Sequence, residues 1–229
     1  MNVLVQSVSG FWFIDSLIGG IPWNWAIEFF GENEKVLNLL FHHVIVYNSR
    51  FSRVYVIIYK DFGGLNPYLI TRLSRIMNGD VDNVLVSRCF RYMDLVELLS
   101  DLVEKGRVEN SVLIIYNPFN NVKGDPRDYV EVNRIISFLH RLKSNGWRII
   151  LFNKVSANGT YSPEGGNFHH HIVNVILRVE PKDDKWCYVE IVKHPFKRIG
   201  FRRSFPYKKL NLGTGDTVWV EQRLLTEWL

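Results

Sequence analysis

Cysteine and long apolar runs are scarce in this 229-residue sequence, and their scarcity excludes several classes of protein. The two cysteines, Cys89 and Cys187, lie far apart and neither belongs to a C-x-x-C pair, which argues against a disulfide scaffold or a zinc ribbon. No apolar run reaches the ~18 residues that a membrane span requires, and no basic-then-apolar leader opens the chain. We therefore expect a soluble, cytoplasmic protein without a membrane partner.

A phosphate-binding loop is also missing from the place where a nucleotide-binding domain carries it. The segment FFGENEKVLN (29–38) follows an apolar lead-in but holds one glycine where the loop needs two. In a P-loop, glycines let N–H groups curl around the phosphates, a lysine neutralises phosphate oxygens, and a Ser or Thr hydroxyl ligates Mg²⁺. These positions fall on Gly31, Val36, Leu37 and Asn38. Lys35 comes two positions early, and Glu32 and Glu34 would place negative charge against phosphates.

The acid that usually ends a neighbouring strand and supports the metal is missing too. The run SVLIIY (111–116) ends in Tyr116 and is followed by Asn117, and these residues hold Mg²⁺ poorly. Together the two losses predict that the chain does not hydrolyse ATP. One alternative stays open, namely a cryptic enzyme with a non-standard nucleotide site around Lys35, Asp61 and Asn117.

Apolar residues, at 47%, are plentiful enough for one packed core. Short runs rich in β-branched residues predict buried strands at 54–58, 83–86, 111–116, 147–152 and 172–179. Segments with apolar residues at helical spacing lie between them, at 66–79, 93–106 and 132–146. This alternation predicts βαβ units, and hence a mostly parallel sheet with helices on both faces.

The helical spacing ends after residue 170, and the segment 176–194 is typical of a hairpin that turns at 181–184. We therefore predict an α/β fold with an antiparallel C-terminal extension. A single domain is expected over 1–229, with a core at about 7–180 and the extension at about 172–229.

Several segments resemble, in order, the ATPase core of the RecA/RadA recombinase family, and specifically an archaeal RadA paralogue. FIDSLIGGIP is similar to the family's LD-x-LL-x-GGI lead-in, WAIEFFGE to the strand that enters its phosphate loop, and EGGNFHHHIVNVILRV to GGNI-x-AH and the strand after it. DNVLVSRCFRYMDLVELL and FLHRLKSNGWRIILFNKV match two further strand and helix pairs. The matches run from about residue 7 to 200, without the family's small N-terminal helical domain.

This resemblance implies a RecA-like core whose Walker A and Walker B motifs have decayed. The family's catalytic glutamate would fall near Phe62, with Asp61 one residue away, and its glutamine sensor would become Lys154. We therefore expect a pseudo-ATPase without a cofactor.

The resemblance also implies two DNA-facing loops, 119–129 and 154–167. Their candidate DNA-binding residues are Lys123, Arg127, Lys154, Asn158 and Tyr161. Cations that neutralise phosphates and rings that stack on bases suit single strands. The alternative is a pair of solvated loops kept from an ancestor.

A basic stretch near the C-terminus offers a second candidate DNA surface, in a chain of net charge +5. Its cations are Lys197, Arg198, Lys208, Lys209, Arg202 and Arg203, interleaved with aromatic residues. An ordinary strand pair with a solvated cationic face would explain the same pattern.

Histidines and tryptophans are more readily explained by packing. On a strand, adjacent residues alternate between faces, so at most two of His169–His171 could converge on a metal, and we expect no metal site. Most tryptophans should fill the core, while some could form a contact patch for another protein.

Our functional hypothesis is a non-catalytic RadA-like paralogue in DNA recombination and repair. It would bind single-stranded DNA, modulate a recombinase, or do both, and its partners would be DNA and a RadA-type recombinase or another paralogue. The alternative is a structural partner that binds only protein.

Overall fold

The computed structural model describes residues 7–19, 21–59, 65–106, 110–119, 126–156, 162–165 and 170–210. Within them lies an eight-stranded sheet of order β3-β2-β4-β5-β1-β6-β7-β8. Its strands are β1 (Ala26–Gly31), β2 (Arg53–Tyr59), β3 (Val84–Cys89), β4 (Ser111–Tyr116), β5 (Arg148–Lys154), β6 (Val175–Pro181), β7 (Trp186–Lys193) and β8 (Arg202–Pro206). The neighbours from β3 to β6 pair in parallel, whereas β6, β7 and β8 pair antiparallel.

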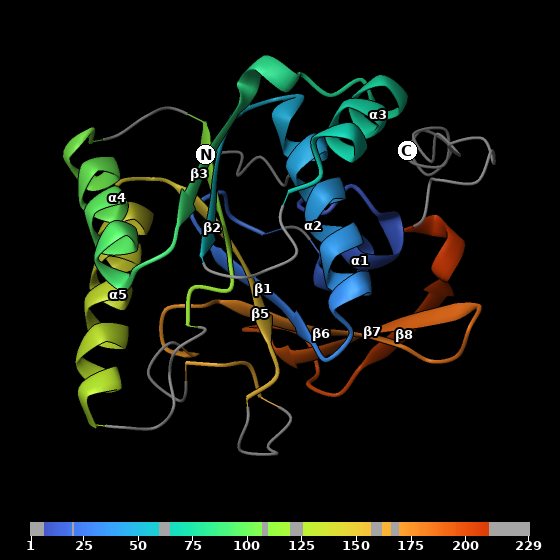
Figure 1. Ribbon diagram of the computed structural model, residues 1–229. Helices are drawn as coiled ribbons and strands as arrows, with labels where there is room; N and C mark the ends of the chain where they lie inside the picture. Colours follow the sequence, from blue (N-terminus) through green and yellow to red (C-terminus); the bar gives the residue numbers. More distant parts are fainter. Residues whose placement is uncertain are drawn as a thin grey trace.

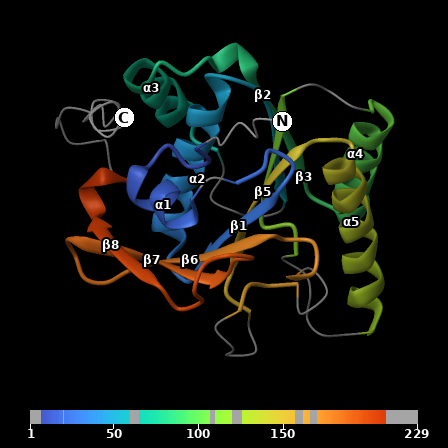
Figure 2. The same cartoon turned by 180° about the vertical axis from the view of Figure 1, so that it is seen from behind.

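Helices cover both faces of the sheet (Figures 1 and 2). They are α1 (Trp12–Ile18), α2 (Glu34–Ser49), α3 (Pro67–Met77), α4 (Tyr92–Glu104) and α5 (Pro126–Ser144), with short 3₁₀ turns η1 (Val81–Asn83) and η2 (Tyr207–Lys209). The first three helices lie on one face and build one hydrophobic core with it, while α4 and α5 build a second core on the other face.

Local sequence explains the limits of α3 well. The Asn66 side chain accepts the N–H of Leu69, and Pro67 occupies the first turn, where its missing N–H costs nothing. The helix ends at Asn78, which adopts the left-handed conformation with φ of 55°. Both signals are readable in the sequence.

The predicted fold class is confirmed: the chain is α/β, with a mostly parallel sheet and an antiparallel C-terminal extension. The predicted hairpin is present, since β6 ends at Pro181 and β7 begins at Trp186. The predicted extent of the single domain stays a prediction, because residues 211–229, which include Trp219 and Trp228, lie outside the described residues. None of the described helices is long and apolar enough to cross a membrane.

Three predicted boundaries were wrong. Strand β3 ends at Cys89, three residues after the predicted 86. Helix α5 begins at Pro126, six residues before the predicted 132, so the last part of the proposed loop 119–129 is helical and Arg127 lies in a first helical turn. Strand β6 begins at 175, three residues later than predicted. The cause is Asn174, whose N–H donates to the Ala26 carbonyl while its side chain accepts the Ala26 N–H, which fixes the chain before the ladder starts.

Candidate functional site

The turn between β1 and α2, where a phosphate loop would lie, contains only Glu32 and Asn33. The Asn33 side chain accepts the N–H of Val36 at 3.0 Å and so caps α2 from within the chain. The N–H of Glu32 donates to the Glu180 carboxylate at 2.7 Å. The helix therefore starts directly after a short turn, and the N–H groups of Glu32 and Val36 already have protein partners.

The positions that a P-loop gives to glycine, lysine and a hydroxyl lie inside this helix. Val36 and Leu37 are buried in the core, and the Asn38 carbonyl is 2.7 Å from Nδ1 of His42. Gly31 has a packing reason to be glycine, because a Cβ there would lie 2.2 Å from the carbonyl oxygen of Val179 on β6. These residues do not fit a triphosphate, since buried aliphatic side chains stand where a P-loop has its second glycine and its lysine.

Two lysines near this turn are engaged with other groups. Nζ of Lys154, at the end of β5, lies 2.6 Å from Oε1 of Glu34 in the first turn of α2. Nζ of Lys35 lies 6.0 Å from the centroid of the Tyr207 ring in η2. Asp61 lies outside the described residues, so the cryptic site proposed around Lys35, Asp61 and Asn117 stays a prediction.

Aromatic side chains fill the end of β4, where the metal-supporting acid would be expected. The Tyr116 ring packs edge-on against Phe41 at 4.7 Å and parallel to Phe152 at 6.0 Å. Burial raises the pKa of Tyr116 well above its ordinary value. Asn117 follows with φ of 59°, and its N–H donates to the Phe152 carbonyl at 2.6 Å. A buried phenol and an amide therefore stand at this strand end.

Sequence reasoning missed two acidic residues in this part of the molecule. Glu28 is fully buried on β1 and accepts a hydrogen bond from the side-chain amide of Asn153. Burial raises the pKa of Glu164 to about 7, although the Lys154 ammonium acts in the opposite direction. The only sequence signal for Glu28 is its place inside an otherwise apolar strand, and the sequence holds no signal for Glu164.

The two proposed DNA loops leave the sheet from neighbouring strand ends. Strands β4 and β5 are parallel, with Tyr116 beside Phe152 in the register, so the loops start close together. Lys123, Asn158 and Tyr161 lie outside the described residues, and their role in DNA binding stays a prediction.

The six cations of the basic stretch follow the β8 edge of the sheet. Lys197 and Arg198 lie in the turn before β8, and Lys208 and Lys209 lie after it in η2. On β8, Arg202 forms an ion pair with Glu190 at 3.0 Å and its guanidinium carbon lies 5.2 Å from the Tyr188 ring centroid. Arg203 packs over Trp12 of α1 at 5.0 Å and donates to the Ser16 hydroxyl.

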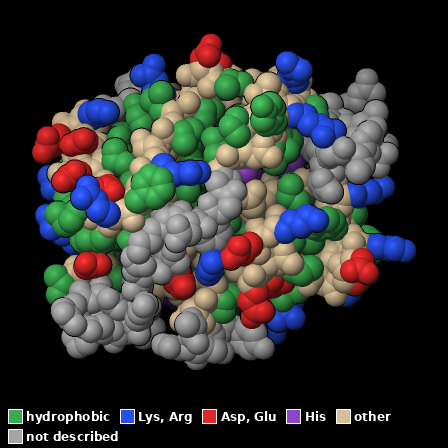
Figure 3. All heavy atoms as spheres, in the orientation of Figure 1, with side chains coloured by type: hydrophobic (Ala, Val, Ile, Leu, Met, Phe, Trp, Pro, Cys, Tyr) green, Lys and Arg blue, Asp and Glu red, His purple; other side chains and the backbone are tan. Residues whose placement is uncertain are grey.

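On the face of the molecule that Figure 3 shows, the visible charges do not mark one site. Figure 3 shows one face of the molecule, on which Lys and Arg side chains are spread between acidic and exposed hydrophobic ones. A binding surface must therefore be identified from particular residues and not from the net charge.

His42, His43 and the two cysteines have packing roles. On α2, Nε2 of His42 accepts the Asn66 N–H at 2.8 Å, and burial lowers the pKa of His42. Burial lowers the pKa of His43 to about 4. Both cysteines are buried and reduced, and burial raises the pKa of each to about 11. Among the described residues, which exclude His169, no His, Cys, Asp and Glu side chains gather as a metal site.

These features define an α/β protein with the RecA-like arrangement of a parallel core and an antiparallel extension. No protein-family model matches the sequence, and no curated protein matches it. Among solved structures, the chain is similar to one described as the crystal structure of the RadB recombinase, with a TM-score of 0.71 over 87% of this chain and 96% of that chain. The sequences are 13% identical, so the likeness shows the fold.

Proposed function

We propose that this protein is a non-catalytic accessory protein of DNA recombination and repair, which docks on a recombinase-type partner and binds single-stranded DNA. The RecA-like fold and the similarity to RadB support the process. The observation that carries the docking is the β3 edge of the sheet, which among the described strands pairs only with β2 and which exposes apolar side chains. Leu85 is 44% exposed and Val86 is 46% exposed.

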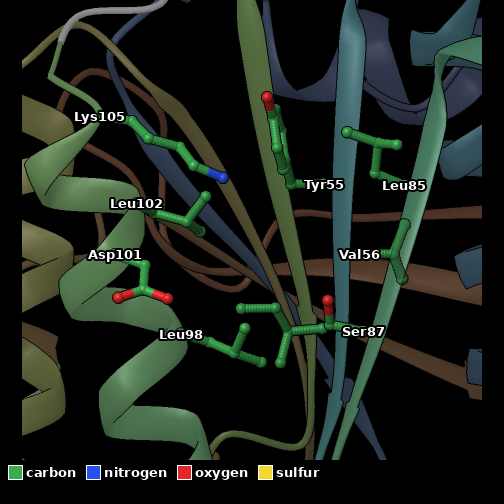
Figure 4. A pocket seen from close by; sticks show the side chains of 9 residues that line it. Tyr55, Val56, Leu85, Ser87, Leu98, Asp101, Leu102 and Lys105 are labelled. Atoms are coloured by element: carbon green, nitrogen blue, oxygen red, sulfur yellow. The ribbon is translucent and has the colours of Figure 1, made fainter.

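A pocket beside this edge supports the docking. Its volume is about 170 Å³, and Figure 4 shows side chains of α4 and of the strands converging on it. The lining comes from Tyr55, Val56 and Ile57 of β2, Leu85 and Ser87 of β3, and Leu98, Asp101, Leu102 and Lys105 of α4. A dry cavity of roughly 150 Å³ accommodates a benzene ring. The pocket therefore has the size for one aromatic or large aliphatic side chain of a partner.

The geometry favours a particular mode of binding. A free strand edge accepts an extended segment that adds a further strand, and alternate side chains of that segment point to the same face. One of those side chains would enter the pocket between α4 and the sheet. Asp101 and Lys105, which line the pocket, would orient the partner's polar groups beside the inserted side chain.

The docking is tested by titrating this protein with a RadA-type recombinase from the same organism in a calorimeter. We expect a stoichiometric complex, and Leu85→Glu should weaken it by at least about 30-fold because a charge then lies where an anchor is buried. Val130→Glu is the matched control, since Val130 is 70% exposed on α5 and does not line the pocket. Equal loss in both variants, or no complex with the wild type, would contradict the docking.

The non-catalytic part of the proposal rests on the two-residue turn and on the buried Val36 and Leu37. It is tested by calorimetry with ATP and Mg²⁺. We expect no measurable heat of binding, and a micromolar affinity that is lost in Lys35→Ala would favour the cryptic enzyme instead.

The DNA part rests on the cations of the β8 edge, and fluorescence anisotropy with a labelled single strand across a salt series tests it. Affinity should fall steeply as salt rises, because bound counterions are released from the phosphates. A stoichiometric protein complex without DNA binding at low salt would favour the purely protein-binding partner. A cytoplasmic location stays a prediction.

A further inference from the structure

We propose that the turn between β7 and β8, residues 194–201, is a platform on which bases of single-stranded DNA stack. We call it the stacking turn. The inference rests on the DNA part of the proposed function and adds a site separate from the two loops after β4 and β5.

Exposed apolar side chains mark the stacking turn. Phe196 is 81% exposed, Ile199 is 66% exposed and Phe201 is 51% exposed, within a stretch of six residues. Trp25 extends the aromatic surface, since its ring centroid lies 6.0 Å from that of Phe196 and 6.3 Å from that of His194. Adjacent exposed rings of this kind indicate a contact surface rather than single stray residues.

Hydrogen bonds hold the backbone of the stacking turn in place. Nδ1 of His194 accepts the N–H groups of Phe196 and Lys197 at 3.0 and 3.1 Å. The N–H of Gly200, whose φ of 80° favours glycine, donates to the Ile191 carbonyl at 2.7 Å. The rings are thus presented by an ordered backbone, which lowers the entropy lost on binding.

Cations lie next to these rings. Lys197 and Arg198 are exposed, and neither forms an ion pair with another described residue. Further positive side chains continue from the stacking turn along β8 into η2. Rings that stack on bases beside cations that neutralise phosphates are the usual means of binding a single strand, whereas a duplex hides the faces of its bases.

The stacking turn lies at the opposite end of the sheet from the two proposed DNA loops. Trp25 directly precedes β1, and Lys193 at the end of β7 pairs with Ile176 near the start of β6. The loops leave from the other ends of the parallel strands, and a six-residue strand is about 20 Å long. A strand bound at the stacking turn would therefore not occupy the loops.

A bilayer is the other surface that an apolar tip with cations could meet. Beyond β8, whose Arg202 is paired with Glu190, the cations Lys208 and Lys209 of η2 lie away from the apolar tip, and this spread favours an extended polyanion. Anionic vesicles are therefore included in the test.

The test compares three variants by anisotropy with a labelled single strand, its abasic equivalent and a duplex. Phe196→Ala with Phe201→Ala should weaken single-strand binding by at least about fivefold per ring and leave the salt slope unchanged. The abasic strand should not distinguish this variant from the wild type. Lys197→Gln with Arg198→Gln should instead lower the salt slope by about 1.4, for two phosphates. Tyr68→Ala on α3 is the control, since its ring is 87% exposed and should have no effect.

The outcomes separate this inference from the proposed function. If the wild type binds single strands and the double phenylalanine variant binds them equally well, the proposed role of the stacking turn is wrong, while the proposed function stands. If the wild type binds no single strand at low salt, the DNA part of the function fails as well. Loss of binding to vesicles containing phosphatidylserine, with DNA binding unchanged, would overturn the inference in favour of a membrane surface. Unchanged melting temperatures show that the variants are folded.

Discussion

The two edges of the sheet differ in the way they treat their unpaired backbone groups. The β8 edge carries arginines and is flanked by lysines, which is how many proteins prevent a foreign strand from pairing. The β3 edge carries the exposed apolar residues Leu85 and Val86 beside one exposed arginine, Arg88, and lies next to a pocket. Two adjacent exposed apolar residues on one edge, in a chain whose other edge carries several cations, are best understood as part of an interface. The contrast therefore favours protein at β3 and polyanion at β8.

The most direct way to break this contrast is to move the charge of one edge onto the other. Val86→Lys should weaken the complex with the recombinase-type partner by at least about 30-fold, because an ammonium would be buried in the added strand pair. Anisotropy on the same variant should show unchanged DNA binding. If both affinities fall together, the edges do not have separate roles.

Gly31, at the end of β1, lies against β6, the strand at which the parallel part of the sheet meets the antiparallel extension. Gly31→Ala would press a Cβ against the Val179 carbonyl and should lower the free energy of unfolding by about 1–3 kcal/mol in urea titrations. Hydrogen exchange should accelerate more in β6–β8 than in β2 and β3. Ser87→Ala on β3 is the control and should change stability little, and uniform acceleration would show that the edges are not separable.

Acid should act on the β8 side through His43, whose Nε2 is 3.1 Å from the Leu210 carbonyl beyond η2. Burial lowers the pKa of His43 to about 4 in the folded protein, from 6.5. Between these two values the unfolded chain binds more protons than the folded protein. The free energy of unfolding is therefore highest above pH 6.5 and falls as the pH drops toward 4, and the loss is about 1–2 kcal/mol at pH 5. Between pH 7.5 and 5, the melting temperature of His43→Gln should fall less than that of the wild type. The melting temperature of His140→Gln, a variant of an exposed residue on α5, should fall as much as that of the wild type. An equal loss in all three would contradict this.

The smallest effect is expected for a single cation of the β8 edge. Lys208→Gln should reduce affinity for single strands by about two- to threefold and the salt slope by about 0.7, for one phosphate. The complex with the protein partner should be unaffected. A variant with unchanged salt slope would place the DNA away from η2.

Sequence reasoning predicted the elements better than their edges. The strand at 111–116 and the caps of α3 follow from local patterns, and the confirmed hairpin follows from its turn residues. The pocket could not be predicted, because Tyr55, Leu85 and Leu98 are distant in the chain and meet only through the strand order. The start of α2 at Glu34 was not predicted either. The resemblance to recombinases directed attention to a decayed loop at this position, and so the capping role of Asn33 was overlooked.

The open β3 edge also has a consequence for the amount of this protein that a cell can make relative to its partner. A chain made in excess of its partner would keep an adhesive strand uncovered, and copies would then pair with each other or with unrelated proteins. We therefore expect cells to produce the two proteins in matched amounts, and we expect overexpression of this chain alone to give aggregates that co-expression prevents.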